Sequence, residues 1–160
     1  GKNGTALRDV ARLKARITNG LSPGGDAILE RDMAEYDTVA ARVTRDGARI
    51  ISYGFNAQAD VRITAMTPDD NGSLVTLSFH QQTLRYRLAV AGKGGVLNSV
   101  ASLIAADLLG VSLPHIIAGL EAYCGDDRHM RIPPLIQPGD VPAMLIDDSN
   151  NDAYLCMLKV

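Results

Sequence analysis

The hydrophobic pattern of the chain changes near residue 60, and this change limits the folds that the chain can adopt. Before it, residues 5–17 and 33–43 carry apolar side chains every three or four positions, and the short apolar runs 27–29 and 48–54 follow them. Helix, strand, helix, strand at such intervals is typical of a parallel sheet covered by helices. The first third of the chain is therefore predicted to be of the α/β class.

The pattern after this change is different. Residues 60–66, 73–80 and 84–90 alternate apolar and polar side chains, and turn-forming sequences separate them. This alternation predicts an antiparallel β meander of three strands. Two helices are predicted next, at 96–109 and 113–123, and the second has a proline in its first turn.

A polar break at residues 125–127 is the best candidate for a domain boundary. Beyond it, residues 131–136 and 143–146 are predicted strands, and no helix follows that could cover them. A parallel sheet of two strands is also too small to stand alone. We therefore expect a segment of a larger protein, with residues 1–125 in one domain and residues 126–160 as the first strands of another.

Charge and composition argue against several classes of function. The 160 residues include 16 basic and 18 acidic side chains scattered along the chain, which argues against a nucleic-acid partner. No apolar run reaches about 18 residues, which argues against a membrane span. Cys124 and Cys156 form no CxxC pair and are too few for a disulfide framework. We expect a soluble, cytoplasmic protein with reduced thiols.

Lys14 is the residue whose position is hardest to explain by folding alone. If residues 5–17 form one helix, Val10, Leu13 and Ile17 share its apolar side and Lys14 lies between them. An unpaired ammonium there would cost several kcal/mol, or its pKa would fall until the group is neutral. Two interpretations remain open: the side chain reaches past its neighbours to solvent, or the lysine is placed for chemistry.

Two other segments are candidates for ligand contacts. The glycine-rich loop 92–95 links a predicted strand to a predicted helix, where backbone N–H groups can bind phosphate, although an ordinary turn explains it equally well. Asp147 and Asp148 end an apolar strand, and carboxylates at that position of an α/β sheet face the ligand crevice. The alternative is a polar turn in which Asp148 caps a helix.

In their order and spacing, these features resemble the Mur ligase family, the ATP-dependent amide-forming enzymes of peptidoglycan precursor synthesis and their relatives. Gly4-Thr5 and the segment 10–17 resemble the family's Gly-Ser/Thr followed by Ala-Lys-x-x-hydrophobic. Residues 24–32 resemble a strand ending in Asn-x-Asp, and residues 91–102 resemble Pro-Gly-x-His-Asn-hydrophobic-x-Asn-x-x-Ala-Ala. Residues 145–151 resemble Ile-Asp-Asp-Ser-Tyr-Asn, which opens the family's C-terminal domain.

The resemblance implies both a fold and a site. Residues 1–125 would be the later part of the family's parallel-sheet ATPase domain, and residues 126–160 the start of its Rossmann-like C-terminal domain. Lys14 matches the lysine that is carbamylated and helps to hold Mg2+, whose preferred ligands are oxygens. Asn98 matches a residue that contacts adenine, and Asp148 one that contacts the ribose. The implied cofactors are ATP and Mg2+.

The sequence also departs from the family pattern. The family's Gly-Lys-Thr/Ser phosphate loop does not occur within it, and Gly94-Gly95 replaces the His-Asn before Asn98. The family's Gly-Arg-Met appears as Arg128-His129-Met130, so the phosphate-contacting arginine is either displaced to Arg128 or missing. These departures fit a divergent ligase of poly-amino-acid or capsule polymers as well as they fit a cell-wall enzyme.

The leading hypothesis is an ATP-dependent carboxylate–amine ligase acting through an acyl phosphate, with this segment inactive alone. Its partners would be a small-molecule or peptide substrate, namely an amino acid or peptide plus a carboxylate acceptor, and the rest of the ligase chain. The alternative is a non-catalytic α/β interaction module that has lost ATP chemistry. A Gly-x-x-Gly-Lys-Thr/Ser loop roughly 80–120 residues upstream of residue 1 would favour the enzyme.

Overall fold

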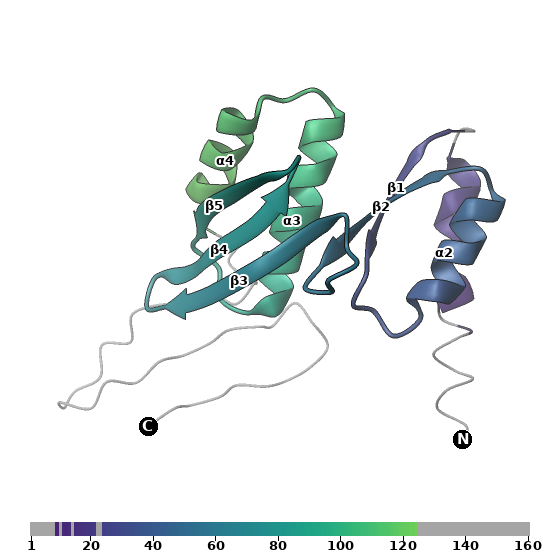
Figure 1. Ribbon diagram of the computed structural model, residues 1–160, viewed down its shortest axis with the longest axis horizontal. Coiled ribbons are helices and arrows are strands. Elements are labelled where there is room, and N and C mark those ends of the chain that lie inside the picture. The colour runs from purple at the N-terminus through teal and green to yellow at the C-terminus, as the bar shows by residue number, and fades with distance from the viewer. Residues whose placement is uncertain (1–8, 10, 14, 22–23, 125–160) are drawn as a thin grey trace, which may run out of the picture. The chain divides into compact units, whose positions relative to one another are not determined.

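A computed structural model of the protein describes residues 9, 11–13, 15–21 and 24–124 (Figure 1). Its elements, in order, are η1 (Ala15–Gly20), β1 (Asp26–Glu30), α2 (Tyr36–Arg45), β2 (Arg49–Gly54), β3 (Val61–Asp69), β4 (Gly72–Phe79), β5 (Gln82–Leu88), α3 (Lys93–Leu108) and α4 (Leu113–Ala122). The strands form one sheet in the order β1-β2-β3-β4-β5. By their contacts, the residues fall into two groups. The first group consists of residues 1–64 and 77–84, and the second group consists of residues 65–76 and 85–160.

The first group is built on the parallel pair β1 and β2, as the sequence predicts. Their register runs from Asp26 beside Arg49 to Glu30 beside Tyr53, and α2 forms the crossover between them. At the first register pair Arg49 Nε donates to Asp26 Oδ1 at 2.6 Å, which lowers the pKa of the Asp26 carboxyl. On its other side, β2 pairs in parallel with β3 through two residue pairs.

Small side chains form one hydrophobic cluster of this group, where η1 and α2 meet β1. Ala15 and Ala27 are buried together with Val39 and Val43 of α2, and partly buried apolar residues pack around them: Ala11, Leu21, Leu29, Met33, Ala48 and Ile50. Because alanine side chains are short, η1 can lie close to both α2 and β1. The core therefore joins the N-terminal helical segment to the parallel strands.

The predicted apolar stripe of residues 5–17 is wrong at one described position. Leu13 is 63% exposed, whereas Ala11 and Ala15 face the core. The prediction placed Leu13 on the buried side, but Leu13 follows Ala11 by two residues and so lies about 200° around the helix axis from it. The side that faces the core is the one that carries the two alanines. Lys14, Val10 and the side chain of Ile17 lie outside the described residues.

β3, β4 and β5 form the predicted meander. Two-residue connections, Asp70-Asn71 and His80-Gln81, join them, and such short connections require antiparallel strands. His80 and Gln81 both have positive φ, at 48° and 63°, which matches the twist of a tight hairpin. The turn therefore ends at Gln81, and β5 begins two residues earlier than the sequence predicts.

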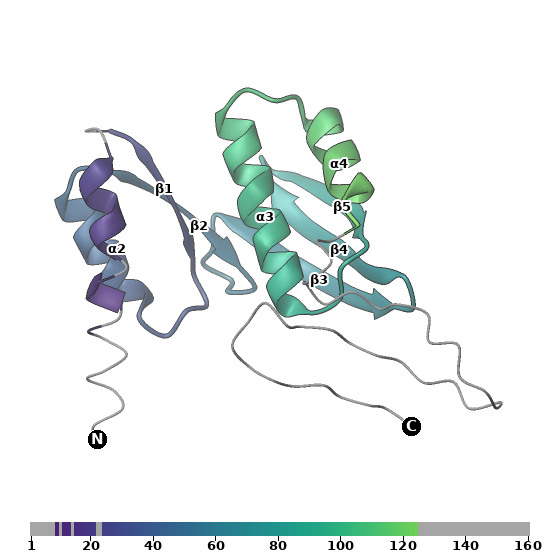
Figure 2. The same cartoon turned by 180° about the vertical axis from the view of Figure 1, so that it is seen from behind.

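α3 covers one face of the meander, and α4 packs against α3 (Figure 2). The core of the second group consists of residues from both layers: Val75, Tyr86, Leu88, Val90, Val96, Leu97, Val100, Leu103, Ile104 and Ile116. Glu121 Oε1 accepts a hydrogen bond from the Arg87 backbone N–H at 3.1 Å, which ties α4 to β5. None of the described helices is long and apolar enough to cross a membrane.

A buried chain of hydroxyl groups connects β5 to α3. Ser99 Oγ lies 2.6 Å from Tyr86 Oη and 2.8 Å from the Val96 carbonyl oxygen. A serine hydroxyl has one proton, and the carbonyl can only accept, so both bonds form when Ser99 donates to Val96 and Tyr86 donates to Ser99. Burial raises the pKa of Tyr86 to about 12.

We expect Tyr86→Phe to change how stability depends on pH. In the wild type, the unfolded tyrosine loses its proton near pH 10 while the folded one keeps it to about 12. The free energy of unfolding should therefore fall by up to about 1.4 kcal/mol per pH unit across this window. Tyr86→Phe should cost about 1 kcal/mol at pH 7 and lack this fall.

Urea denaturation of the intact protein between pH 7 and 12 measures both effects. Tyr123→Phe is the matched control, because Tyr123 is 49% exposed. A constant difference between wild type and Tyr86→Phe over the whole range would contradict the assignment.

Candidate functional site

The carboxyl ends of β1 and β2 lie side by side, at the edge where α/β sheets place ligand contacts. Asp32, two residues after β1, accepts a hydrogen bond at Oδ2 from the Phe55 backbone N–H at 2.6 Å. The Arg31 backbone N–H donates to the Tyr53 carbonyl at 2.7 Å and extends the ladder by one bond. One backbone hydrogen bond and one carboxylate, that of Asp32, therefore hold the two loops that follow the strands together.

Gly54 is required for this arrangement. Its φ is +144°, and a Cβ built there would lie 2.5 Å from Asp32 Oδ2. A side chain at this position would strain the backbone and displace the carboxylate from Phe55.

The side chains at this edge are already engaged in internal contacts. The Arg31 guanidinium donates to Gln58 Oε1 at 2.9 Å and lies 4.0 Å from the centroid of the Tyr36 ring. Burial, with the nearby charge of Glu30, raises the pKa of Tyr53. These contacts give Arg31 and Tyr36 a structural role in shaping the loop after β1.

We expect Gly54→Ala to lower the free energy of unfolding by about 2 kcal/mol or more, because of the positive φ and the contact with Asp32. Gly119→Ala is the matched control: Gly119 lies within α4 with open space around its Cβ position, and alanine there should stabilise by about 0.5–1 kcal/mol. Thermal unfolding of the intact variants tests the pair. Equal midpoints for Gly54→Ala and wild type would refute the geometry of this edge.

The predicted glycine-rich loop 92–95 is only partly a loop: α3 begins at Lys93, three residues earlier than the sequence predicts, so Gly94 and Gly95 lie in its first turn and only Gly92 precedes it. Gly92 has a φ of 90° immediately before α3, and a Cβ at Gly95 would lie 2.8 Å from Val90 Cγ1. Both positions therefore require glycine for packing or backbone reasons. Gly94 has open space around its Cβ position and no such requirement.

Asn98 is the one predicted site residue that lies within the described part of the chain. It is exposed on α3, and its carbonyl oxygen accepts a hydrogen bond from Ser102 Oγ at 2.9 Å. Its side-chain amide makes no hydrogen bond to any described residue, so it is available to a ligand. Lys14, Arg128 and Asp148 lie outside the described residues, as do the strands predicted at 131–136 and 143–146.

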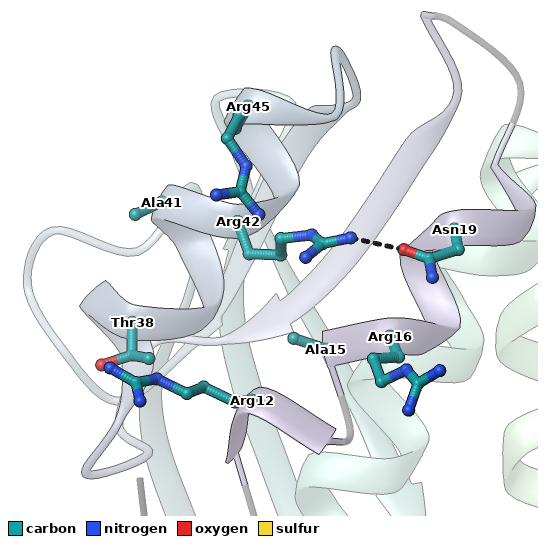
Figure 3. A pocket seen from close by; sticks show the side chains of 8 residues that line it. All are labelled: Arg12, Ala15, Arg16, Asn19, Thr38, Ala41, Arg42 and Arg45. Carbon is teal, nitrogen blue, oxygen red and sulfur yellow. Dashed lines mark hydrogen bonds between the residues drawn. The ribbon is translucent and has the colours of Figure 1, made fainter. Parts of the chain in front are cut away.

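A cavity of about 510 Å³ lies in the first group and is not predicted from the sequence. It is lined by Arg12, Ala15, Arg16, Asn19, Thr38, Ala41, Arg42 and Arg45 (Figure 3). The sequence does show two arginine pairs, at i,i+4 and at i,i+3, on two helical segments. It does not show that folding brings these two segments together. No group of three or more His, Cys, Asp or Glu side chains that could hold a metal occurs among residues 24–124 and the described positions before them.

These elements define an α/β fold with a mixed, five-stranded sheet. The chain belongs to the Mur ligase family: residues 4–106 match the family model described as the Mur ligase middle domain. The resemblance seen in the sequence is confirmed.

Relatives named as Mur ligases match the chain along most of its length. The UDP-N-acetylmuramate–L-alanine ligase of Streptomyces avermitilis is 29% identical over 112 residues, 70% of this chain and 24% of that protein. The enzyme of the same name from Hyphomonas neptunium is 34% identical over 135 residues, 78% of this chain and 28% of that protein. The crystal structure of MurF from Acinetobacter baumannii superposes with a TM-score of 0.73 at 28% identity, covering 92% of this chain and 30% of that one. The chain thus spans about a quarter to a third of the length of these relatives.

Proposed function

We propose that the intact protein is an ATP-dependent ligase that joins a carboxylate to an amine, as in cell-wall precursor or poly-amino-acid synthesis. The observation that supports this most strongly is the match of residues 4–106 to the Mur ligase middle domain. Relatives named as UDP-N-acetylmuramate–L-alanine ligases add support for amide formation on a carboxylate acceptor.

The proposed reaction divides into two transfers. ATP transfers its γ-phosphoryl group to the carboxylate of the acceptor, and ADP is the leaving group. The amine of an amino acid or peptide then attacks this acyl phosphate and loses a proton, and phosphate leaves as the amide forms. Positioning of the two substrates and neutralisation of phosphate charge would supply most of the rate enhancement. Mg2+, when bound, would neutralise that charge as a Lewis acid.

The chain's own residues have separate roles in this proposal. Lys14 as its carbamate would supply an oxygen ligand for the metal, a role that suits a hard cation. The exposed Asn98 amide would contact the adenine, and the Asp148 carboxylate would accept hydrogen bonds from the ribose hydroxyls. Arg128 is the candidate for a phosphate contact, since guanidinium and phosphate groups pair in a bidentate geometry. The domain division at residues 125 and 126 belongs to the same proposal.

We expect Lys14→Ala to lower the ligase activity of the intact protein by at least about 100-fold, because a metal ligand would be lost. Acetate or formate should restore part of the activity by supplying the missing carboxylate. Lys14→Arg is the matched control, since it keeps the positive charge but cannot form a carbamate; it should be equally inactive. Full activity of Lys14→Ala without added carboxylate would refute the role.

We expect Asp148→Ala to weaken ATP binding by about 10- to 150-fold, the value of one charge-assisted hydrogen bond. Asp147→Ala removes the same charge one residue earlier and should have a smaller effect. Calorimetry of the intact protein with Mg-ATP compares the two. An equal loss in both variants would mean that overall charge, and not a ribose contact, is responsible.

A further inference from the structure

The cavity between the N-terminal helical segment and α2 holds an excess of positive charge. Four arginines line it, two from each side (Figure 3). Two carboxylates contact them: Asp9, 3.9 Å from Arg12, and Asp46, whose oxygens lie 2.7 Å from Arg42 and 3.9 Å from Arg45. The four guanidinium groups of the lining therefore exceed by two the carboxylates that contact them.

One arginine is fixed in place across the cavity. Arg42 Nε donates to Asp46 Oδ2, and its Nη2 donates to Asn19 Oδ1 at 2.6 Å, so the side chain reaches from α2 to the segment opposite (Figure 3). This places a guanidinium at the cavity without an ordering cost when a ligand binds.

The side chain of Arg16, in contrast, is not held in place by described residues. Its guanidinium makes no hydrogen bond or ion pair with any described residue, and it lies on an exposed position of η1. It follows Arg12 by four residues, a spacing at which like charges on a helical segment repel each other. An anion between the two segments would relieve this repulsion.

The size and shape of the cavity also fit a small ligand. Ala15 and Ala41 contribute only methyl groups to the lining, which leaves the space between the arginines open. A volume of about 510 Å³ lies within the usual range for small-molecule sites. The polar groups of Asn19 and Thr38 at its walls are already bonded: Asn19 Oδ1 accepts from Arg42, and Thr38 Oγ1 donates to Glu35 Oε2 at 2.9 Å, which places one further carboxylate beside the cavity.

We propose that this cavity binds a compact polyanion, a ligand that carries two or more phosphate or carboxylate groups. Guanidinium groups pair with both kinds of oxyanion in a bidentate geometry. Arg42 provides the fixed contact, while Arg16 and Arg45 close on the ligand. The proposal does not depend on the ligase activity of the intact protein.

Calorimetry of the intact protein with tripolyphosphate and, separately, with citrate tests the site and distinguishes the two oxyanions. We expect binding of at least one probe, weakened about tenfold by Arg16→Gln, which removes a charged partner. Because Arg16 has no partner among the described residues, this variant should keep the thermal stability of the wild type. Binding should also weaken as salt rises from about 0.05 to about 0.2 M, because screening is stronger there.

Arg85→Gln is the matched control, since Arg85 is an exposed arginine that does not line the cavity. It removes the same charge and should leave the affinity for the probe unchanged. Binding of tripolyphosphate alone assigns a phosphate ligand, and binding of citrate alone a carboxylate ligand. If neither probe binds at millimolar concentration, or if Arg85→Gln and Arg16→Gln weaken binding equally, the proposal is wrong.

Discussion

Contact between small side chains in the first group determines how closely its helical segments approach. Ala15 is buried against Ala27, Val39 and Val43, and it also lines the arginine cavity. A larger side chain at Ala15 would push η1 away from α2, because a packed core has little room for added methylene groups. The same displacement would lengthen the bond between Arg42 and Asn19. Ala15 therefore contributes both to the packing of this core and to the width of the cavity.

The fold could be predicted from the sequence to the extent that local patterns determine it. Period-two alternation and two-residue turns depend on neighbouring residues, so the meander was predictable, and so were the parallel β1 and β2 with a helix between them. The shift of β5 to Gln82 came from the positive φ of His80 and Gln81, which no periodicity reveals. The exposure of Leu13 had a different cause: the segment buries the side that carries Ala11 and Ala15, and Leu13 lies nearly opposite to it.

The candidate site could be predicted only in part, and for physical reasons. In the sequence, Asn98 is a polar residue on a predicted helix, as any solvent-facing asparagine would be. Only the family resemblance indicates that it contacts a ligand. The contact between Asp32 and Gly54 was not predicted, because it joins residues 22 positions apart and depends on the parallel register of β1 and β2. Glycine after a strand signals a close approach but does not reveal what approaches.

Net charge and local charge lead to different conclusions in this protein. A net charge of −2 with scattered basic residues argues against binding a long polyanion, because nucleic acids require an extended basic surface. Ionic interactions at physiological salt are screened beyond about 8 Å, so a small ligand responds only to the charges around it. Folding gathers Arg12 and Arg16 beside Arg42 and Arg45 within one cavity. A chain that is acidic overall can therefore still attract a small anion at a single site, and the whole-chain charge does not predict whether it does.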